Sequence, residues 1–254
     1  MSWNLLRPDL GQRFVGIENF IVLLKDPQVV NCILNTLYFT GGAVFIELIG
    51  GLGLALLLSK KIKGVAIFRS LLMIPLMVAP VVTGFVWRLL LDLDFGPIFH
   101  ILRSLGFSTL ANCPILSNRS LVIPTLILVD AWISTPLVML VLLAGLESIP
   151  SQPYEAASVD GASRLQLFWY ITLPLLKSAI LVALLIRTIN AIRFFDIVFI
   201  MTGGGPGTSS EVMSLYNYRI SFIHYQMGYG AAVSFLILLI SMTISFTYIR
   251  LLRR

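Results

Sequence analysis

Six ionisable residues lie inside long apolar stretches of this sequence: Glu47, Arg88, Asp130, Arg187, Arg193 and Asp196. Charged side chains in such surroundings rarely face lipid and usually pair with one another or line a water-filled cavity. Arg193 and Asp196 are three positions apart, and Asn190 precedes Arg193 by the same step, so a helix would hold all three near one face. Two interpretations are open. These residues line part of a hydrophilic path, or Arg193 and Asp196 form an internal salt bridge near a membrane interface.

The remaining charges have simpler expected roles. We expect Glu47 and Asp130 to hold helices together, and Arg88, beside Trp87, to anchor a helix end at the interface. Arg187 lies in the same apolar stretch as Arg193 and Asp196. Three central charges would cost about 8–10 kcal/mol on the insertion scale, which the apolar residues of that stretch offset by roughly 5–9 kcal/mol. That stretch is therefore predicted to be an interior helix.

No pattern for catalysis or nucleotide binding occurs in this chain. The run TGGGPG at 202–207 lacks the lysine of the phosphate loop G-x-x-x-x-G-K-[ST], and there is no G-x-S-x-G or H-E-x-x-H. Cys32 and Cys113 are far apart and His100 and His224 are isolated, so we expect free thiols and no metal site. The chain is predicted to have no catalytic residues and not to be an enzyme. ATP that energises it would have to be hydrolysed by a partner.

Composition indicates what must position these residues. The chain has 254 residues, of which 57% are hydrophobic and 12% charged, against about 25% charged in a soluble domain. The mean hydropathy is +0.93. Apolar runs long enough to cross a hydrocarbon core of about 30 Å occur at about 33–58, 67–91, 121–146, 175–201 and 228–251. The sequence predicts an all-α polytopic membrane protein with about five spans.

Basic residues predict the orientation of these spans. They gather between the first two runs and at the chain end, at Lys60, Lys61, Lys63, Arg69, Arg250, Arg253 and Arg254. Lys and Arg are enriched on the cytoplasmic side. The C-terminus and the segment 147–174 are therefore expected in the cytoplasm, residues 1–31 outside, and residues 32–254 as the membrane domain. Topology explains the net charge of +6 without a nucleic-acid partner.

Segment 147–174 is the long polar break between two apolar halves. Ser151 is a candidate N-cap for a first helix that Gly161 would end, because glycine reaches positive φ freely. Ser163 and Gln166 have the spacing of a capping box for a second helix, and Pro174 is expected to close it. A docking loop for a partner and an ordinary interhelical connection both fit this pattern.

The same segment resembles the EAA motif (EAA-x3-G-x9-I-x-LP) of permease subunits in binding-protein-dependent ABC importers of type I. The matching residues are Glu155, Ala156, Ala157, Gly161, Ile171, Leu173 and Pro174, and Asp160 is also typical. Other stretches are similar to the carbohydrate-uptake branch, of maltose and glycerol-3-phosphate type. They are FVGIENF at 14–20, RFFD at 193–196, TGGGPG at 202–207 and GYGAA at 228–232.

The resemblance implies a function. The EAA loop would dock on an ABC ATPase dimer that carries ATP and Mg²⁺, so the permease itself would bind no cofactor. A second, different permease subunit and an extracytoplasmic solute-binding protein would complete the importer. It would carry a carbohydrate-like solute across the lipid of the cell (inner or plasma) membrane. The alternative is a secondary transporter or channel that uses the intramembrane charges directly.

One departure from the family pattern concerns the N-terminus. Such permeases usually have a further span before the F-V-G-x-E-N segment, which would give six. Three explanations are open: a truncated chain, a misplaced start, or five spans.

Overall fold

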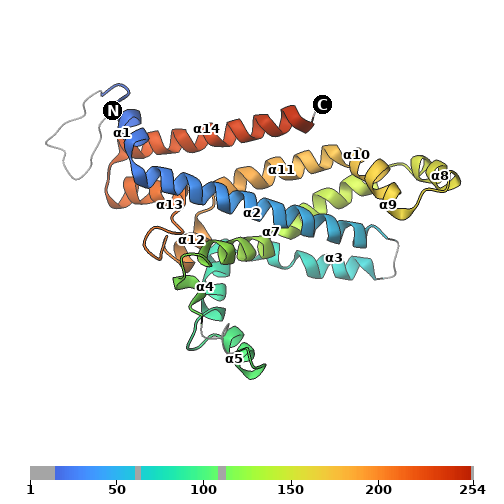
Figure 1. Cartoon of the computed structure of the whole chain (residues 1–254), viewed down its shortest axis with the longest axis horizontal. Coiled ribbons are helices and arrows are strands. Elements are labelled where there is room, and N and C mark those ends of the chain that lie inside the picture. Colours follow the sequence, from blue (N-terminus) through green and yellow to red (C-terminus); the bar gives the residue numbers. More distant parts are fainter. Residues whose placement is uncertain (1–14, 61–63, 108–112, 253–254) are drawn as a thin grey trace. The chain divides into compact units, whose positions relative to one another are not determined.

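The computed structural model describes residues 15–60, 64–107 and 113–252. These residues form helices joined by turns and short loops, and no strand occurs among them (Figure 1). Phe14, the first residue of the FVGIENF stretch, and all residues before it lie outside these ranges. Lys61, Lys63, Arg253 and Arg254 also lie outside them. The helices are α1 Glu18–Lys25, α2 Pro27–Leu58, α3 Val65–Met73, α4 Pro80–Leu90, α5 Pro97–Ser104, α7 Val122–Glu147, α8 Gln152–Val159, α9 Arg164–Leu167, α10 Leu173–Leu175, α11 Lys177–Ile192, α12 Asp196–Met201, α13 Met213–Tyr218 and α14 Met227–Leu252. Short 3₁₀ turns are η2 Pro75–Met77 and η3 Ile115–Ser117, and π-helical turns are η4 Phe168–Thr172 and η5 Arg219–Ile223.

The predicted all-α membrane fold is confirmed. Within the described ranges, four helical segments are long and apolar enough to cross a membrane, and a fifth candidate is a helix pair with a break in it. The four segments are Pro27–Leu58, Val122–Glu147, Lys177–Met201 and Met227–Leu251. The first begins at Pro27, so the expected boundary between residues 31 and 32 falls inside a helix.

The fifth candidate, α3 with η2 followed by α4, corrects the expectation of one continuous span over 67–91. Val78 and Ala79 are both extended, with ψ of 132° and 136°. Proline disfavours the helical region for the residue before it, and Pro80 therefore holds Ala79 out of the helix. Pro80 then starts α4, where its missing N–H is not needed.

The described chain divides into two compact units, each built from separate stretches of sequence. Unit 1 comprises residues 1–43, 79–130 and 189–243, and unit 2 comprises 44–78, 131–188 and 244–254. A single membrane domain is expected from the sequence. Four of the boundaries between these units fall inside α2, α7, α11 and α14, and the fifth lies between η2 and α4.

Unit 1 is organised around a small core and a buried carboxylate. The core joins α1 and the start of α2 to α13 and α14 through Leu23, Val29, Cys32, Met213, Tyr216, Ala232 and Val233. The TGGGPG run begins a turn-rich loop, and the loop leads to Glu211, which is 0% exposed. The Glu211 carboxylate accepts from Arg219 Nη1 at 2.5 Å and from Gln28 Nε2 at 2.7 Å. This network fixes the loop against α2. Cys32 and Cys113 are free thiols, as expected.

Asp26, at the corner between α1 and α2, ties these helices to the same core. Its Oδ2 accepts hydrogen bonds from the hydroxyls of Tyr216 at 2.6 Å and Tyr229 at 3.0 Å. Burial acts to raise the pKa of Asp26, but the hydrogen bonds from Tyr216, the Gln28 and Val29 backbone N–H groups and Tyr229 together lower it below 3.8.

Because the pKa of Asp26 is lower in the folded state, its ionised form stabilises the fold above the unfolded value, and this contribution is lost as pH falls through the folded pKa. We expect Asp26→Asn to lower the melting temperature of the detergent-solubilised protein by about 2–4 °C at neutral pH, for a loss of about 1 kcal/mol. The difference from wild type should shrink on acidification below the ordinary pKa. Asp94→Asn, at an exposed carboxylate, is the charge control. An equal effect of both substitutions at every pH would contradict this role.

Unit 2 is built on close helix packing. Ala55 and Leu58 of α2 meet Val138, Met139, Leu142 and Leu143 of α7, with Leu176 and Ala183 on the α11 side. A Cβ on Gly51 would lie 2.7 Å from Val138 Cγ1, and one on Gly145 would lie 2.5 Å from Ala179 Cβ. Gly51 and Gly145 therefore allow these helices to approach closely, whereas Gly53 has no heavy atom within 4 Å of its Cβ position.

Candidate functional site

The predicted docking segment forms two helices joined by a glycine turn, both within unit 2 (Figure 1). The first is α8, and Gly161 follows it with φ of +79°. The N–H of Ala162 bonds the Ala157 carbonyl at 2.9 Å and the N–H of Gly161 bonds the Ser158 carbonyl at 3.2 Å. These two bonds form a Schellman motif, in which a left-handed residue closes the helix and satisfies its last carbonyls. The prediction that Gly161 ends this helix is confirmed.

The second helix begins at the predicted capping box. Ser163 N–H donates to Gln166 Oε1 at 2.7 Å, and Gln166 N–H donates to Ser163 Oγ at 3.4 Å. Ser151 behaves differently from the prediction. It has helical dihedrals and forms no side-chain cap bond, because the helical turn already includes it.

The expectation that Pro174 closes this segment is wrong. The chain passes from α9 through the π-helical turn η4 into α10, which contains Pro174, and on to α11. Proline lacks the N–H that would bond the residue four positions earlier, and a π turn is a way for a helix to absorb such a defect. Leu173 N–H bonds the Phe168 carbonyl, and Thr172 Oγ1 donates to the Leu167 carbonyl at 3.3 Å.

The surface of α8 is open to a partner. Glu155, Ala156, Asp160 and Gly161 are exposed, and Val159 is 88% exposed, while Ala157 and Leu173 are half-buried and Pro174 is exposed. Tyr154 donates from its hydroxyl to Thr172 Oγ1 at 3.1 Å and so joins α8 to the buried side of η4. A hollow of about 270 Å³ lies beside the glycine turn, lined by residues of α8, α9 and η4. This corner presents the carboxylates of Glu155 and Asp160 to the outside, together with the apolar side chain of Val159.

The proposed path residues do not share one continuous helix. α11 ends at Ile192, and Arg193 to Phe195 form a break before α12 begins at Asp196. Asn190, Arg193 and Asp196 are all exposed. Ion pairs in the described part of the chain include those of Arg69 with Glu147, Arg187 with Glu47 and Arg219 with Glu211, and neither Arg193 nor Asp196 forms one. The expected Arg193–Asp196 pair is thus not formed, because the break removes the helical register on which it depended.

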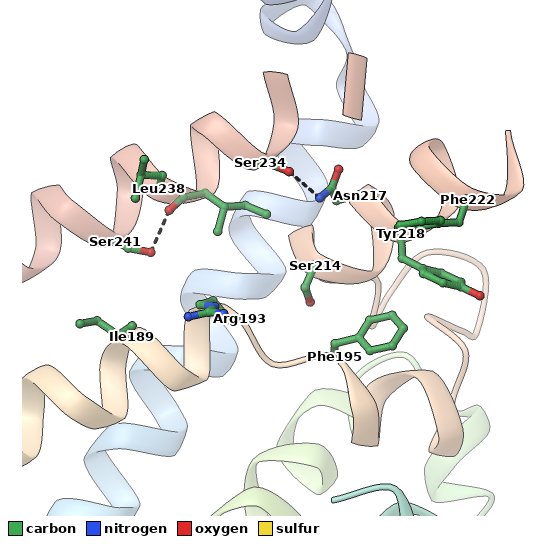
Figure 2. A pocket seen from close by; sticks show the side chains of 11 residues that line it. Ile189, Arg193, Phe195, Ser214, Asn217, Tyr218, Phe222, Ser234, Leu238 and Ser241 are labelled. Atoms are coloured by element: carbon green, nitrogen blue, oxygen red, sulfur yellow. Dashed lines mark hydrogen bonds between the residues drawn. The ribbon is translucent and has the colours of Figure 1, made fainter. Parts of the chain in front are cut away.

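Arg193 instead lines a cavity of about 500 Å³ in unit 1, whereas Asn190 and Asp196 do not (Figure 2). Phe195, in the break before α12, also lines this cavity. Phe194 stacks on Phe39 with 4.3 Å between ring centroids. Tyr216 is buried, and its hydroxyl donates to Asp26. Sequence reasoning missed Ser214, Asn217, Tyr218 and Phe222, because these cavity residues come from α13 and η5 rather than from a long apolar run.

A buried ion pair in unit 2 is the other feature that the sequence did not reveal. Arg187 Nε lies 2.5 Å from Glu47 Oε2, and Arg187 Nη2 lies 2.6 Å from Glu47 Oε1. Glu47 is 0% exposed and Arg187 is 6% exposed. The expected role of Glu47 in joining helices is confirmed, since the pair links α2 to α11. Two parallel bonds of this kind fix distance and orientation together.

Long apolar helices, a buried ion pair and an exposed helical loop define a multi-pass helical membrane protein. Its family is shown by comparison. The model of the family "Binding-protein-dependent transport system inner membrane component" matches residues 66–254, and the chain belongs to this family.

Relatives with assigned names support the same grouping. The chain is 38% identical over 241 residues to the trehalose/maltose transport system permease protein MalF of Thermococcus litoralis, covering 94% of this chain and 79% of that protein. It is 35% identical over 254 residues to the sulfoquinovosyl glycerol transport system permease protein SmoG of Agrobacterium fabrum, covering 98% and 80%. The resemblance to permease subunits is thereby confirmed.

The fold is also known from a solved structure. A chain of the bacterial alginate ABC transporter, in complex with alginate pentasaccharide-bound periplasmic protein, superposes with a TM-score of 0.84. The match covers 98% of this chain and 88% of that chain, at 23% sequence identity.

Proposed function

We propose that this chain is the permease subunit of an ATP-driven importer for a carbohydrate or carbohydrate-like solute. The observation that carries the proposal is the exposed α8–Gly161–α9 corner, which has the EAA residues on its surface and a direct helical connection to α11. Family membership and relatives named for the transport of trehalose, maltose and sulfoquinovosyl glycerol support the solute class. An extracytoplasmic binding protein would deliver the solute.

In this proposal the chain has no catalytic role and binds no nucleotide. An ABC ATPase dimer would hold ATP and Mg²⁺ and seat the corner formed by Glu155, Ala156, Ala157, Asp160 and Gly161. Closure of the dimer would then bias the helices between two states through different contacts at this corner. Leu173 and Pro174 would carry the movement into α11, since the helix continues through them.

The proposal also includes the remaining subunits and the orientation. A second, different permease would pair with this chain, and residues 147–174 and the C-terminus would face the cytoplasm. Residues 1–31, which include the first turn of α2, would lie on the outer side. Asn190, Arg193 and Asp196 would lie along the route of the solute. Exposure of all three path residues and the cavity beside Arg193 support this route.

Attachment of the ATPase tests the docking corner. Glu155 is exposed in the first turn of α8, so replacing it by lysine reverses the charge presented to a partner without disturbing packing. We expect Glu155→Lys to reduce co-purification of the ATPase at least tenfold. Gln152→Lys, which adds a positive charge at an exposed position of the same turn, should retain it. Flux that persists when no ATPase is bound would instead support a secondary transporter or channel and overturn the proposal.

A further inference from the structure

The cavity beside Arg193 has a composition that points to one class of ligand. It holds about 500 Å³ and is open to the outside of unit 1. Its walls come from the end of α11, from α13 and η5, and from α14 (Figure 2). A pocket of this size, with apolar walls and a few polar groups, is typical of small-molecule sites.

Most polar side chains in this wall are already engaged within the protein. Ser214 Oγ donates to the Phe194 carbonyl at 2.5 Å, and Asn217 Nδ2 donates to Ser234 Oγ at 2.8 Å. Ser241 Oγ donates to the Ile237 carbonyl at 2.8 Å. These bonds use the hydroxyl donors of Ser214 and Ser241 and one of the two amide N–H donors of Asn217.

The Arg193 guanidinium is different. Across the described ranges, its side chain forms no hydrogen bond or ion pair, and no Asp or Glu lines the cavity. Asp196, the acid nearest in sequence, lies beyond the break and outside the lining. A guanidinium carries five N–H donors in a planar fork that suits carboxylate and phosphate oxygens. The cavity therefore offers a positive charge and unused donors to whatever enters it.

Aromatic rings complete the site. Phe195 and Tyr218 lie with their ring centroids 5.1 Å apart, and Phe222 follows Tyr218 at 5.6 Å. Their apolar faces suit the C–H faces of a sugar ring, while the guanidinium suits an acidic substituent on that ring. Neither feature alone selects a ligand, but together they match an acidic sugar.

We propose that this cavity binds the anionic group of an acidic saccharide, a carboxylate, sulfonate or phosphate, through Arg193. This inference rests on the proposed function, because it names the class of solute that the importer carries. A lipid phosphate shares the same chemistry, and the test below distinguishes it from a saccharide.

Binding of two matched probes tests the proposal. Glucuronate and glucose share a ring and differ at C6, where a carboxylate replaces a hydroxymethyl group. We expect the purified, assembled transporter in phosphatidylcholine nanodiscs, without the binding protein, to bind glucuronate at least tenfold more tightly than glucose by equilibrium dialysis. Arg193→Gln should abolish this preference while retaining glucose binding, and Arg193→Lys should keep part of it. Arg119→Gln, at an exposed arginine of the same unit outside the cavity, should leave the preference intact.

Several results would overturn the inference. They are equal binding of the two probes, no saturable binding of glucuronate, a preference that survives Arg193→Gln, or one that Arg119→Gln abolishes equally. Loss of glucuronate binding on adding phosphatidylglycerol would assign the guanidinium to lipid phosphate. Failure of the proposed function has a separate signature, which is the absence of ATP-driven uptake of any saccharide by the complete transporter with its binding protein.

Discussion

Replacing Glu47 by alanine is expected to cost about 3–5 kcal/mol of stability, the usual effect of removing one partner from a buried ion pair. The carboxylate accepts two hydrogen bonds from Arg187, and both side chains are almost fully buried between α2 and α11. For a chain of this size each 1 kcal/mol shifts the melting temperature by about 2–4 °C, so the expected decrease is roughly 6–20 °C. Thermal unfolding of the detergent-solubilised protein measures it.

The double variant Glu47→Leu/Arg187→Leu is the matched control. Replacing both members of a buried pair by apolar residues is often neutral, because no charge remains to be solvated. We therefore expect the double variant to recover most of the stability that Glu47→Ala loses. Recovery would show that the pair specifies helix positions more than it stabilises them. A double variant as unstable as the single one, or a single variant with an unchanged melting temperature, would contradict this account.

The fold class could be predicted because it depends on composition and run length. A run of about 20 apolar residues has few alternatives to a membrane helix, and four such segments are confirmed. The break before Pro80 could be anticipated from local chemistry, since the residue before proline avoids the helical region. The break at Arg193–Phe195 contains neither proline nor glycine, so the local sequence does not announce it.

The docking corner could be predicted in more detail than the rest, because its determinants are local. Gly161 needs positive φ, and the Ser163–Gln166 capping box closes within four residues. The errors at Ser151 and Pro174 have the same origin. Serine can cap a helix or lie within its first turn, and proline can end a helix or lie in the first turn of the next one. The neighbouring turns decide which of these roles Ser151 and Pro174 have.

The cavity and the ion pair could not be predicted, because they join residues far apart in the sequence. Glu47 and Arg187 are 140 positions apart, and each was recognised as an intramembrane charge without its partner. The cavity draws on α11, α13, η5 and α14, so a single segment carries no pattern for it. What sequence analysis could supply was the identity of Arg193 as an unusual charge, and the structure supplied its surroundings.

Gly161→Val is expected to leave the protein in the membrane but reduce ATP-driven uptake at least tenfold relative to ATP hydrolysis. A Cβ at this position would meet no heavy atom within 4 Å, so crowding is not the obstacle. The obstacle is the φ of +79°, which a β-branched residue adopts only at a cost of about 1–2 kcal/mol. Relief of that strain would open the Schellman turn and change the angle between α8 and α9, so that force on α8 no longer reaches α11.

Gly161→Asn separates this conformational cause from the mere presence of a side chain. Asparagine tolerates the left-handed region and often replaces glycine at helix C-termini. We expect Gly161→Asn to retain most of the coupling, and Gly161→Ala to fall between the two. Uptake and ATPase activity would be measured together in proteoliposomes that contain the complete transporter. If valine and asparagine impair uptake equally, the turn geometry is not what matters, and the bulk at the docking surface is. Normal coupling in the valine variant would remove the corner from the transport mechanism altogether.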